Sequence, residues 1–573
     1  MHPDRLTIRG IVSIGVVAAA LAPATASAQT VTIEGTPFRD DISIGGLSTA
    51  YGTYSVNNGP AVPLDGATRV IVNAGGGDDD VWISNPSDSL FAARDGIRVN
   101  GEDGTDKLYD FWGRAAQGSL DHVAADGAGT KTITHTGALP QKIVLDSVEN
   151  VDDSVQEPIW TYRGTDGSDE VTLVDGGQIP TRTGSICCYP ARLRDGVGEI
   201  VPSYKSSSVL IDTKGSGATP DSVTLSGPEP IANVLTVDDG RATPEDVVHL
   251  SYSPSFYADE LGMTPAVNVR AARVDGWGYS GDSLAVETAQ LAPDGGVLTA
   301  NAKKLEVQAS SDIAVASNQR LQLGGASERL NGVQSSAASV SVQTTGLLAA
   351  AADDEVRGKD VTLTSDAIDL PGRVTATGGT LRLRPRAAGT PVDLGAATNA
   401  AGTYSVSSAE LKNATGVPVE VGSATSGRVA VTAPVASRSD LRLVSGGGYT
   451  ATGGGAIEAP ALAFEDRSAT GRTWTVDGTG VAVTPGARIA YAPTSRVRFQ
   501  GGTGADRFLV KASPLVPFTL NGGDPATAPG DALVYQAEGR TVSGDTTAPD
   551  GRIDSPGVKP VTFGAIEEVS IAP

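Results

Sequence analysis

A recurring phrase of glycine and aspartate residues could bind a cation. In this phrase a glycine is followed five positions later by an aspartate, and two positions after that by an aliphatic residue or phenylalanine. The copies occupy residues 35–42, 74–81 (with alanine in place of the glycine), 101–108, 164–171 and 501–508. Calcium takes about six to eight oxygen ligands, which glycine-rich turns supply as backbone carbonyl groups and aspartates supply as carboxylates. The phrase therefore predicts calcium sites at these turns.

The expected calcium ligands are aspartates of these turns, namely Asp79, Asp103, Asp106, Asp169 and Asp506. Asp79 and Asp106 lie 27 residues apart, within the ~20–50-residue period of repeat folds, so their carboxylates would be neighbours on successive turns. Stacked carboxylates repel each other unless a proton or a cation lies between them. An alternative needs no ion, because an aspartate in a turn can accept hydrogen bonds from backbone N–H groups. The sequence leaves both interpretations open.

Short β-strands must hold these turns in place. The phrase leads into segments that alternate between inward and outward side chains, as at Val171–Leu173 and Phe508–Val510, which predicts a strand after each turn. A second phrase, aliphatic–Glu–x–Val, occurs at residues 148–151 and 566–569. We expect it to form the closing strand of the modules that the aspartate turns open.

The middle of the chain consists of shorter apolar segments between turns of small residues. Val361–Leu363, Leu381–Leu383 and Leu441–Leu443 are examples. Strands of this length offer too few inward side chains to form a core alone, so they must stack on copies of themselves. Aromatic residues make up only 5% of the chain and glycines number 71. We predict an all-β fold, a parallel β-helix (β-solenoid), with an array of antiparallel β-sandwich modules as the alternative.

Two resemblances extend this prediction. Gly501–Phe508 resembles one repeat of the calcium-binding nonapeptide of RTX-type proteins, and the segments around Asp79, Asp106 and Asp169 resemble it less completely. Residues 408–429 look like the repeats of filamentous-haemagglutinin-type β-helical adhesins, a similarity that extends over about 283–495. The resemblance implies a right-handed parallel β-helix exported by a bacterium, in which the flanking modules bind calcium and the repeats serve adhesion.

The N-terminus carries the features of a signal peptide at residues 1–28. Arg5 and Arg9 give a short basic start before an apolar run, Ile11–Leu21, and Ala26–Ala28 is a small-residue cleavage site. No later stretch is long and apolar enough to span a membrane. We therefore expect a secreted or cell-surface protein with no transmembrane segment in the mature chain. The rest of the chain is divided into an acidic module at 29–155, a second acidic module at 156–282, the repeat body at 283–495 and a C-terminal module at 496–573.

Charge is distributed unevenly along the chain and restricts the partners. The net charge is −23, of which residues 29–300 carry −22, whereas residues 301–500 carry +2. Phosphate recognition needs basic patches, so this balance argues against nucleic acid and anionic membranes. A glycan or protein of the cell surface or matrix remains the expected partner.

Residues that could support catalysis are few. His122, His135 and His249 are scattered without metal-ligand spacing or an adjacent nucleophile, so we assign no catalytic residue. The adjacent pair Cys187 and Cys188 excludes a disulfide-stapled scaffold. We expect a non-catalytic adhesion or interaction protein. The alternatives are a secreted carbohydrate-active enzyme, a polysaccharide lyase or hydrolase, and a structural component of a surface layer or matrix.

Overall fold

The computed structural model describes most of the chain outside the N-terminal segment and several loops. The described residues are 28–48, 51–122, 130–137, 140–165, 167–174, 192–195, 198–201, 208–213, 220–227, 232–239, 244–252, 266–291, 296–396, 399–492, 496–524 and 530–573. The apolar run of the expected signal peptide and the Cys187–Cys188 pair lie outside these residues. In the part of the chain described, no helix is long and apolar enough to cross a membrane.

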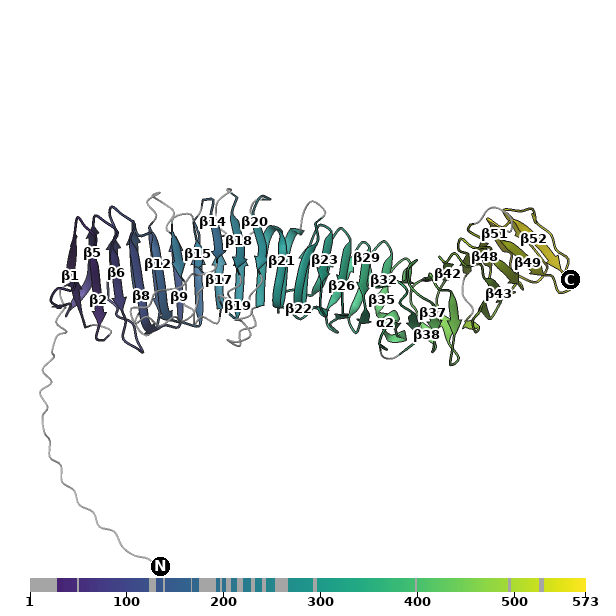
Figure 1. Ribbon diagram of the computed structural model, residues 1–573. Coiled ribbons are helices and arrows are strands. Elements are labelled where there is room, and N and C mark those ends of the chain that lie inside the picture. The colour runs from purple at the N-terminus through teal and green to yellow at the C-terminus, as the bar shows by residue number, and fades with distance from the viewer. Residues whose placement is uncertain are drawn as a thin grey trace, which may run out of the picture.

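Parallel β-strands stack along an elongated body, which we call the rod, with β1 near one end and the C-terminus at the other (Figure 1). Most strands pair with strands of the preceding and following coils, as expected for a solenoid. In the N-terminal half one stack contains β1 (Gln29–Thr36), β5 (Ala67–Gly75), β7 (Ile97–Asn100) and β11 (Gln141–Asp146). A second contains β2 (Asp41–Gly46), β6 (Asp80–Ser84), β8 (Lys107–Arg114), β12 (Asn150–Gln156) and β16 (Glu199–Val201).

Two further stacks continue the rod toward its middle. One contains β9 (Gln117–His122), β13 (Ile159–Arg163), β17 (Ser208–Asp212), β19 (Val234–Asp238) and β21 (Ala266–Leu291). The other contains β14 (Glu170–Val174), β18 (Ser222–Gly227), β20 (Val247–Tyr252) and again β21. β21 then pairs with β22 (Leu298–Ala309).

One stack runs from the middle of the chain to its C-terminal end. Its strands are β23 (Ile313–Ser317), β26 (Val340–Thr344), β29 (Val361–Ser365), β32 (Leu381–Pro385), β36 (Val419–Gly422), β39 (Leu441–Ser445), β42 (Leu462–Asp466), β46 (Val497–Gln500), β48 (Phe518–Asn521) and β51 (Val561–Gly564). A C-terminal stack is formed by β43 (Thr473–Asp477), β47 (Arg507–Val510), β49 (Ala532–Gln536) and β52 (Glu568–Ala572). A short helix, α2 (Ser408–Asn413), lies between strands.

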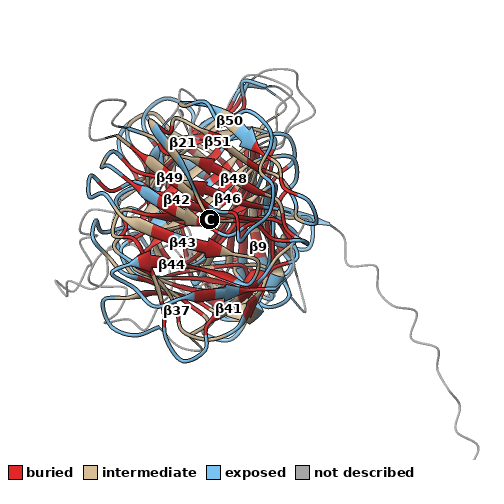
Figure 2. Ribbon diagram, turned by 90° about the vertical axis from the view of Figure 1, so that its right-hand side faces the viewer, coloured by how far each residue is buried: buried red, intermediate tan, exposed pale blue. Residues whose placement is uncertain are grey.

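The core is a set of aliphatic columns inside the rod. Val361, Leu381 and Val419 are in register on β29, β32 and β36 and are fully buried. Viewed along the rod, buried strands surround the interior and exposed loops form the outer rim (Figure 2). Alternate residues point inward because a strand repeats every two residues, so each short strand adds two or three aliphatic side chains to the columns.

The all-β solenoid prediction is confirmed, and the sandwich alternative is wrong, because strands far apart in sequence pair in parallel. Strand pairing also continues across the expected module boundaries, which follow residues 155, 282 and 495. β12 pairs with β8 before it and β16 after it, residue 282 lies within β21, and β42 pairs with β46.

Antiparallel hairpins interrupt the parallel pattern. β10 (Lys131–Thr136) pairs antiparallel with both β9 and β11 and brings its own side chains into the interior. This insertion places His135 inside the rod.

Candidate functional site

The aspartates of the glycine–aspartate phrase stack at the position just before successive strands. Asp40, Asp79, Asp106 and Glu149 precede β2, β6, β8 and β12 and are in register. The N–H of Asp40 donates to Asp79 Oδ1 at 2.6 Å, and that of Asp79 donates to Asp106 Oδ1 at 2.9 Å. The N–H of Asp106 donates to Glu149 Oε2 at 2.7 Å. We call this arrangement a carboxylate ladder.

Two more carboxylate ladders share this geometry. The N–H of Asp169 donates to Asp221 Oδ1 at 2.9 Å, and the N–H of Asp221 donates to Asp246 Oδ1 at 3.3 Å. At the C-terminal end the N–H groups of Arg472, Asp506 and Asp531 donate to Asp506, Asp531 and Glu567 at 2.8, 2.6 and 2.6 Å. The glutamate of the second sequence phrase therefore terminates two of the ladders.

Close packing explains the first glycine in the copies that have one, whereas the copy at 74–81 carries a buried alanine, Ala74. A Cβ on Gly101 would lie 1.9 Å from the carbonyl oxygen of Ser147 on the next coil and 2.4 Å from Asp106 Oδ2. A Cβ on Gly501 would lie 2.1 Å from Gly522 O and 2.5 Å from Asp506 Oδ2. Glycine therefore makes room for the aspartate carboxylate that follows it, which explains the fixed spacing of the phrase.

The expected calcium ligands occupy different places. Asp79 and Asp106 are neighbours, as predicted from their spacing. Asp103 lies apart from them on an exposed turn, where its backbone pairs with Gly76. Asp169 and Asp506 lie in the other two ladders.

Sequence reasoning found no partners for Asp169 and Asp506, yet both have them. Asp221 and Asp246 follow a glycine by six residues instead of five, so they escape a search with fixed spacing. Asp531 follows the long insertion after Gly522, and a Cβ on Gly522 would lie 2.3 Å from Asp531 Oδ2. The ladder position tolerates different loop lengths in front of it.

Burial changes the acidity of the ladders. Burial raises the pKa of Asp106 to about 7, and neighbouring Asp79 and Glu149 add to the effect. Burial also raises the pKa values of Asp221 and Asp531 to about 6. Asp79 Oδ2, Asp106 Oδ2 and Asp531 Oδ2 are buried and accept no hydrogen bond. Each ladder therefore concentrates negative charge that a proton or a cation would relieve.

A second arrangement lies inside the rod, around His135. Its Nε2 lies 3.1 Å from Asp110 Oδ2 and 3.6 Å from Asp153 Oδ1, and its Nδ1 lies 3.1 Å from Glu157 Oε2. All four side chains are buried. Among the described residues, Asp110, His135 and Asp153 form the one group of three whose possible metal-ligand atoms all lie within 4.8 Å of one another. We call these three residues and Glu157 the histidine cluster.

The groups of the histidine cluster shift one another's pKa values. Burial raises the pKa of Asp153 to about 8 and raises that of Glu157, against the opposing effect of His135. Burial alone would lower the pKa of His135, but Asp153, Asp110 and Glu157 raise it well above its ordinary value. The three carboxyl groups therefore favour the protonated form of the imidazole.

Sequence reasoning set His135 aside as scattered, and this interpretation missed the cluster. The available signal was local: Asp110 and Asp153 occupy inward positions in strands whose other inward residues are apolar, such as Leu108 and Val151. The two aspartates are also in register with each other. The antiparallel β10 that supplies His135 could not be anticipated from the spacing of solenoid strands.

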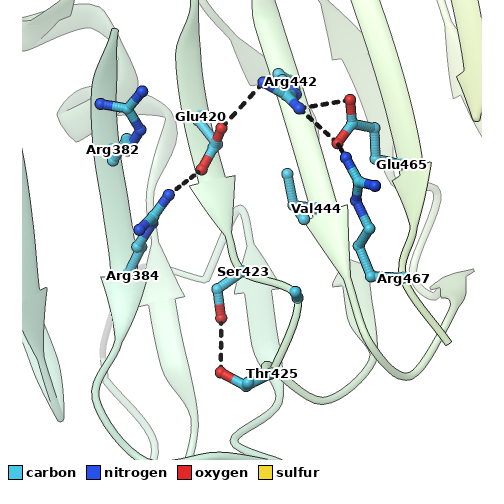
Figure 3. A pocket seen from close by; sticks show the side chains of 10 residues that line it. Arg382, Arg384, Glu420, Ser423, Thr425, Arg442, Val444, Glu465 and Arg467 are labelled. Carbon is cyan, nitrogen blue, oxygen red and sulfur yellow. Dashed lines mark hydrogen bonds and ion pairs between the residues drawn. The ribbon is translucent and has the colours of Figure 1, made fainter.

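A third arrangement lies on the outer face of the long stack and forms a hollow of about 520 Å³ (Figure 3). Four arginines and two glutamates contribute to its lining, so positive charge is in excess. Ion pairs link these side chains: Arg384–Glu420 at 2.8 Å, Arg442–Glu420 at 3.3 Å, Arg442–Glu465 at 2.6 Å and Arg467–Glu465 at 2.9 Å. Arg382, which lies 3.5 Å from Asp360 outside the lining, completes the set. We call this hollow the arginine groove.

The hollow exists because small side chains interrupt a row of long ones. Arg384, Gly422, Val444 and Glu465 follow one another across β32, β36, β39 and β42. Gly422 adopts a φ of 91° and a Cβ there would lie 2.2 Å from Val444 O, so a larger residue would be strained. The loop at Ser423–Thr425 borders the space.

No protein-family model matches the chain, and no curated protein or solved structure matches it either. The function is therefore inferred from the chemistry of these three arrangements. The ladders satisfy backbone N–H groups, the histidine cluster presents metal-ligand atoms to one point, and the arginine groove presents guanidinium groups to solvent.

Proposed function

We propose that this chain is a secreted or cell-surface, non-catalytic interaction protein that binds an acidic glycan in the arginine groove. The observation that carries the proposal is the groove itself, an outward-facing hollow lined by four arginines on a rigid parallel sheet. Guanidinium groups bind carboxylate and sulfate groups through paired, charge-assisted hydrogen bonds. The surface lies in the segment of the chain that carries +2, whereas residues 29–300 carry −22.

The glutamates of the groove favour binding over hydrolysis. Glu420 is paired with Arg384 and Arg442, and Glu465 is paired with Arg442 and Arg467. A general acid for glycoside hydrolysis needs a carboxyl group that retains its proton near neutral pH. Each of these carboxylates is instead occupied by ion pairs with two guanidinium groups, so these glutamates are suited to positioning the arginines.

The binding proposal is tested with immobilised polysaccharides that carry uronate or sulfate groups, compared with neutral dextran. We expect salt-sensitive binding to the acidic polymers only, since exposed charges are screened by salt. The double variant Arg384→Gln, Arg467→Gln should bind at least about tenfold more weakly. Arg552→Gln removes an exposed arginine at the C-terminal end that pairs with Asp554, and it should bind like the unaltered chain.

Four outcomes would contradict the proposal. Equal binding by the double variant would place the ligand elsewhere on the rod. New reducing ends or unsaturated products during incubation would indicate the carbohydrate-active enzyme. Absence of binding to every acidic polymer would favour the structural surface-layer alternative, and soluble cytoplasmic chain of full precursor mass would contradict export.

A further inference from the structure

The carboxylates of the histidine cluster are held in fixed orientations. Asp110 Oδ1 accepts a hydrogen bond from Asn85 Nδ2 at 2.7 Å, which leaves Oδ2 directed at His135 Nε2. Asp153 Oδ2 accepts a hydrogen bond from Trp160 Nε1 at 2.9 Å, and its Oδ1 lies on the side of His135 Nε2. Each carboxylate therefore has one oxygen anchored from outside and one oxygen facing a shared point.

The imidazole ring is oriented in the same manner. Glu157 Oε2 lies 3.1 Å from His135 Nδ1 and can accept its proton in a hydrogen bond. Nε2 then faces the two aspartate oxygens. A histidine that ligates a metal almost always donates its other ring N–H to a carboxylate or carbonyl group, which fixes the tautomer. Glu157 supplies that outer partner.

Charge in the histidine cluster is unbalanced. Three carboxyl groups surround one imidazole in the interior of the rod, and Glu157 Oε1 accepts no hydrogen bond although Glu157 is only 2% exposed. Buried ionised groups are retained where they are paired or coordinate a metal. A divalent cation at the shared point would balance the two aspartates and relieve the repulsion among the carboxylates.

We propose that Asp110, His135 and Asp153 bind one divalent first-row transition-metal ion, with zinc the best match, in a structural site. Zinc binds histidine nitrogen and carboxylate oxygen at about 2.0–2.2 Å, so two ligand atoms in a tetrahedral site lie about 3.3 Å apart. The distances from Nε2 to the two aspartate oxygens, 3.1 and 3.6 Å, bracket this value. On binding, the ion takes the Nε2 lone pair, and any proton on Nε2 is released to solvent.

The ligand set distinguishes this site from the calcium sites expected at the ladders. Calcium is a hard cation that takes oxygen ligands, whereas imidazole suits zinc and its first-row neighbours. The ligands come from β8, β10 and β12, so the ion would fasten the antiparallel insertion to two coils of the solenoid. Complete burial suits a structural ion rather than a catalytic one.

Metal content of the full chain tests the proposal. The chain is produced in medium supplemented with Zn²⁺ or Co²⁺, purified by gel filtration and analysed by inductively coupled plasma mass spectrometry. We expect about one tightly held ion per chain, and visible d–d absorption from the Co²⁺ form. X-ray absorption at the metal edge should show one imidazole ligand among oxygen ligands. A chain without a stoichiometric ion, or an ion with oxygen ligands alone, would overturn the proposal.

Variants locate the ion. Asp110→Asn keeps the shape of the side chain and should lose the ion, as should His135→Gln. Glu157→Gln should retain the ion with an affinity lowered about 10- to 100-fold. His249→Gln alters a histidine outside the cluster that pairs with Asp275, and it should retain the ion fully. Retention by folded Asp110→Asn and His135→Gln chains would overturn the proposal, and the measurement on the unaltered chain decides the question even if a variant fails to fold.

Discussion

The flanks and the middle of the rod use the position before each strand in different ways. In the first ladder, carboxylates follow one another on successive coils at Asp40, Asp79 and Asp106. In the middle, Asp312 is followed on the next coil by Ser339, and Asp360 by Thr380. Aspartates alternate there with hydroxyl residues, so in these coils no two carboxylates are neighbours.

The hydrogen bonds also run in opposite directions. In the flanks an N–H group donates to the carboxylate of the following coil, whereas Ser339 N–H donates back to Asp312 Oδ1 at 2.8 Å and Thr380 N–H donates back to Asp360 Oδ1 at 2.9 Å. Asp312 is exposed, while Asp79 and Asp106 are 1% exposed. Both designs satisfy backbone N–H groups, but the ladders bury charge, and their aspartates contribute to the −22 of residues 29–300.

The largest expected effect comes from adding one methyl group to a ladder. Gly101→Ala places a Cβ against the backbone of the next coil and against Asp106, neither of which can move freely. We expect destabilisation of about 3 kcal/mol. Gly378→Ala is the control in the middle of the chain, where a Cβ meets nothing within 4 Å. Urea unfolding monitored by circular dichroism measures both, and equal effects would show that the ladder packing is unimportant.

The next effect concerns pH. The pKa of Asp106 is raised to about 7 in the fold from about 3.9 in an unfolded chain. The protonated carboxyl therefore favours the fold, and the contribution of Asp106 to stability is fully present below about pH 4 and is lost as pH rises through about 7. Asp106→Asn removes this loss while keeping an oxygen for the Asp79 N–H. We expect the variant to be more stable by on the order of 2 kcal/mol at pH 8 and equally stable at pH 4.

Asp360→Asn is the matched control for the pH experiment. Asp360 accepts the Thr380 N–H in the alternating arrangement and lies 3.5 Å from Arg382, so we expect its variant to gain no stability at pH 8. Thermal unfolding in the presence of a calcium chelator, from pH 4 to pH 8, measures both variants. An Asp106→Asn chain that is less stable than the unaltered chain at pH 8 would contradict the raised pKa.

A ladder can also be built where none exists. Ser339→Asp places a carboxylate between Asp312 and Asp360 on the neighbouring coils. We expect a loss of about 1 kcal/mol at pH 8 that disappears at pH 4, because three adjacent carboxylates repel one another when ionised. Ser339→Asn has similar size without the charge and serves as the control. Identical melting curves for the two variants at pH 8 would show that carboxylate stacking is harmless in this fold.

Much of the fold follows from short-range sequence patterns. The period-two segments such as Val361–Leu363, with few aromatic residues, predicted stacked short strands, and the 27-residue interval correctly placed Asp79 beside Asp106. These features depend on local alternation and on the repeat length, both of which a single sequence displays.

The ladders, the histidine cluster and the arginine groove were less predictable, because their residues come together only through coils of unequal length. Asp169 and Asp221 are 52 residues apart, so no regular period connects them. His135 reaches Asp110 and Asp153 through an antiparallel insertion that breaks the repeat. The arginine groove depends on register between β32, β36, β39 and β42, and on the missing side chain at Gly422, neither of which single-strand patterns reveal.

The smallest expected effect concerns calcium at the ladders, which remains a prediction from the sequence. Asp79 Oδ2 and Asp106 Oδ2 accept no hydrogen bond and offer two oxygens on adjacent coils, fewer than calcium prefers. We therefore expect weak binding: millimolar Ca²⁺ should stabilise the chain by about 0.5–1 kcal/mol at pH 8, and by less at pH 5, where protons compete. Asp106→Asn should abolish the gain and Asp360→Asn should keep it. If Ca²⁺ leaves the melting curve of the unaltered chain unchanged at pH 8, protons alone neutralise the ladders.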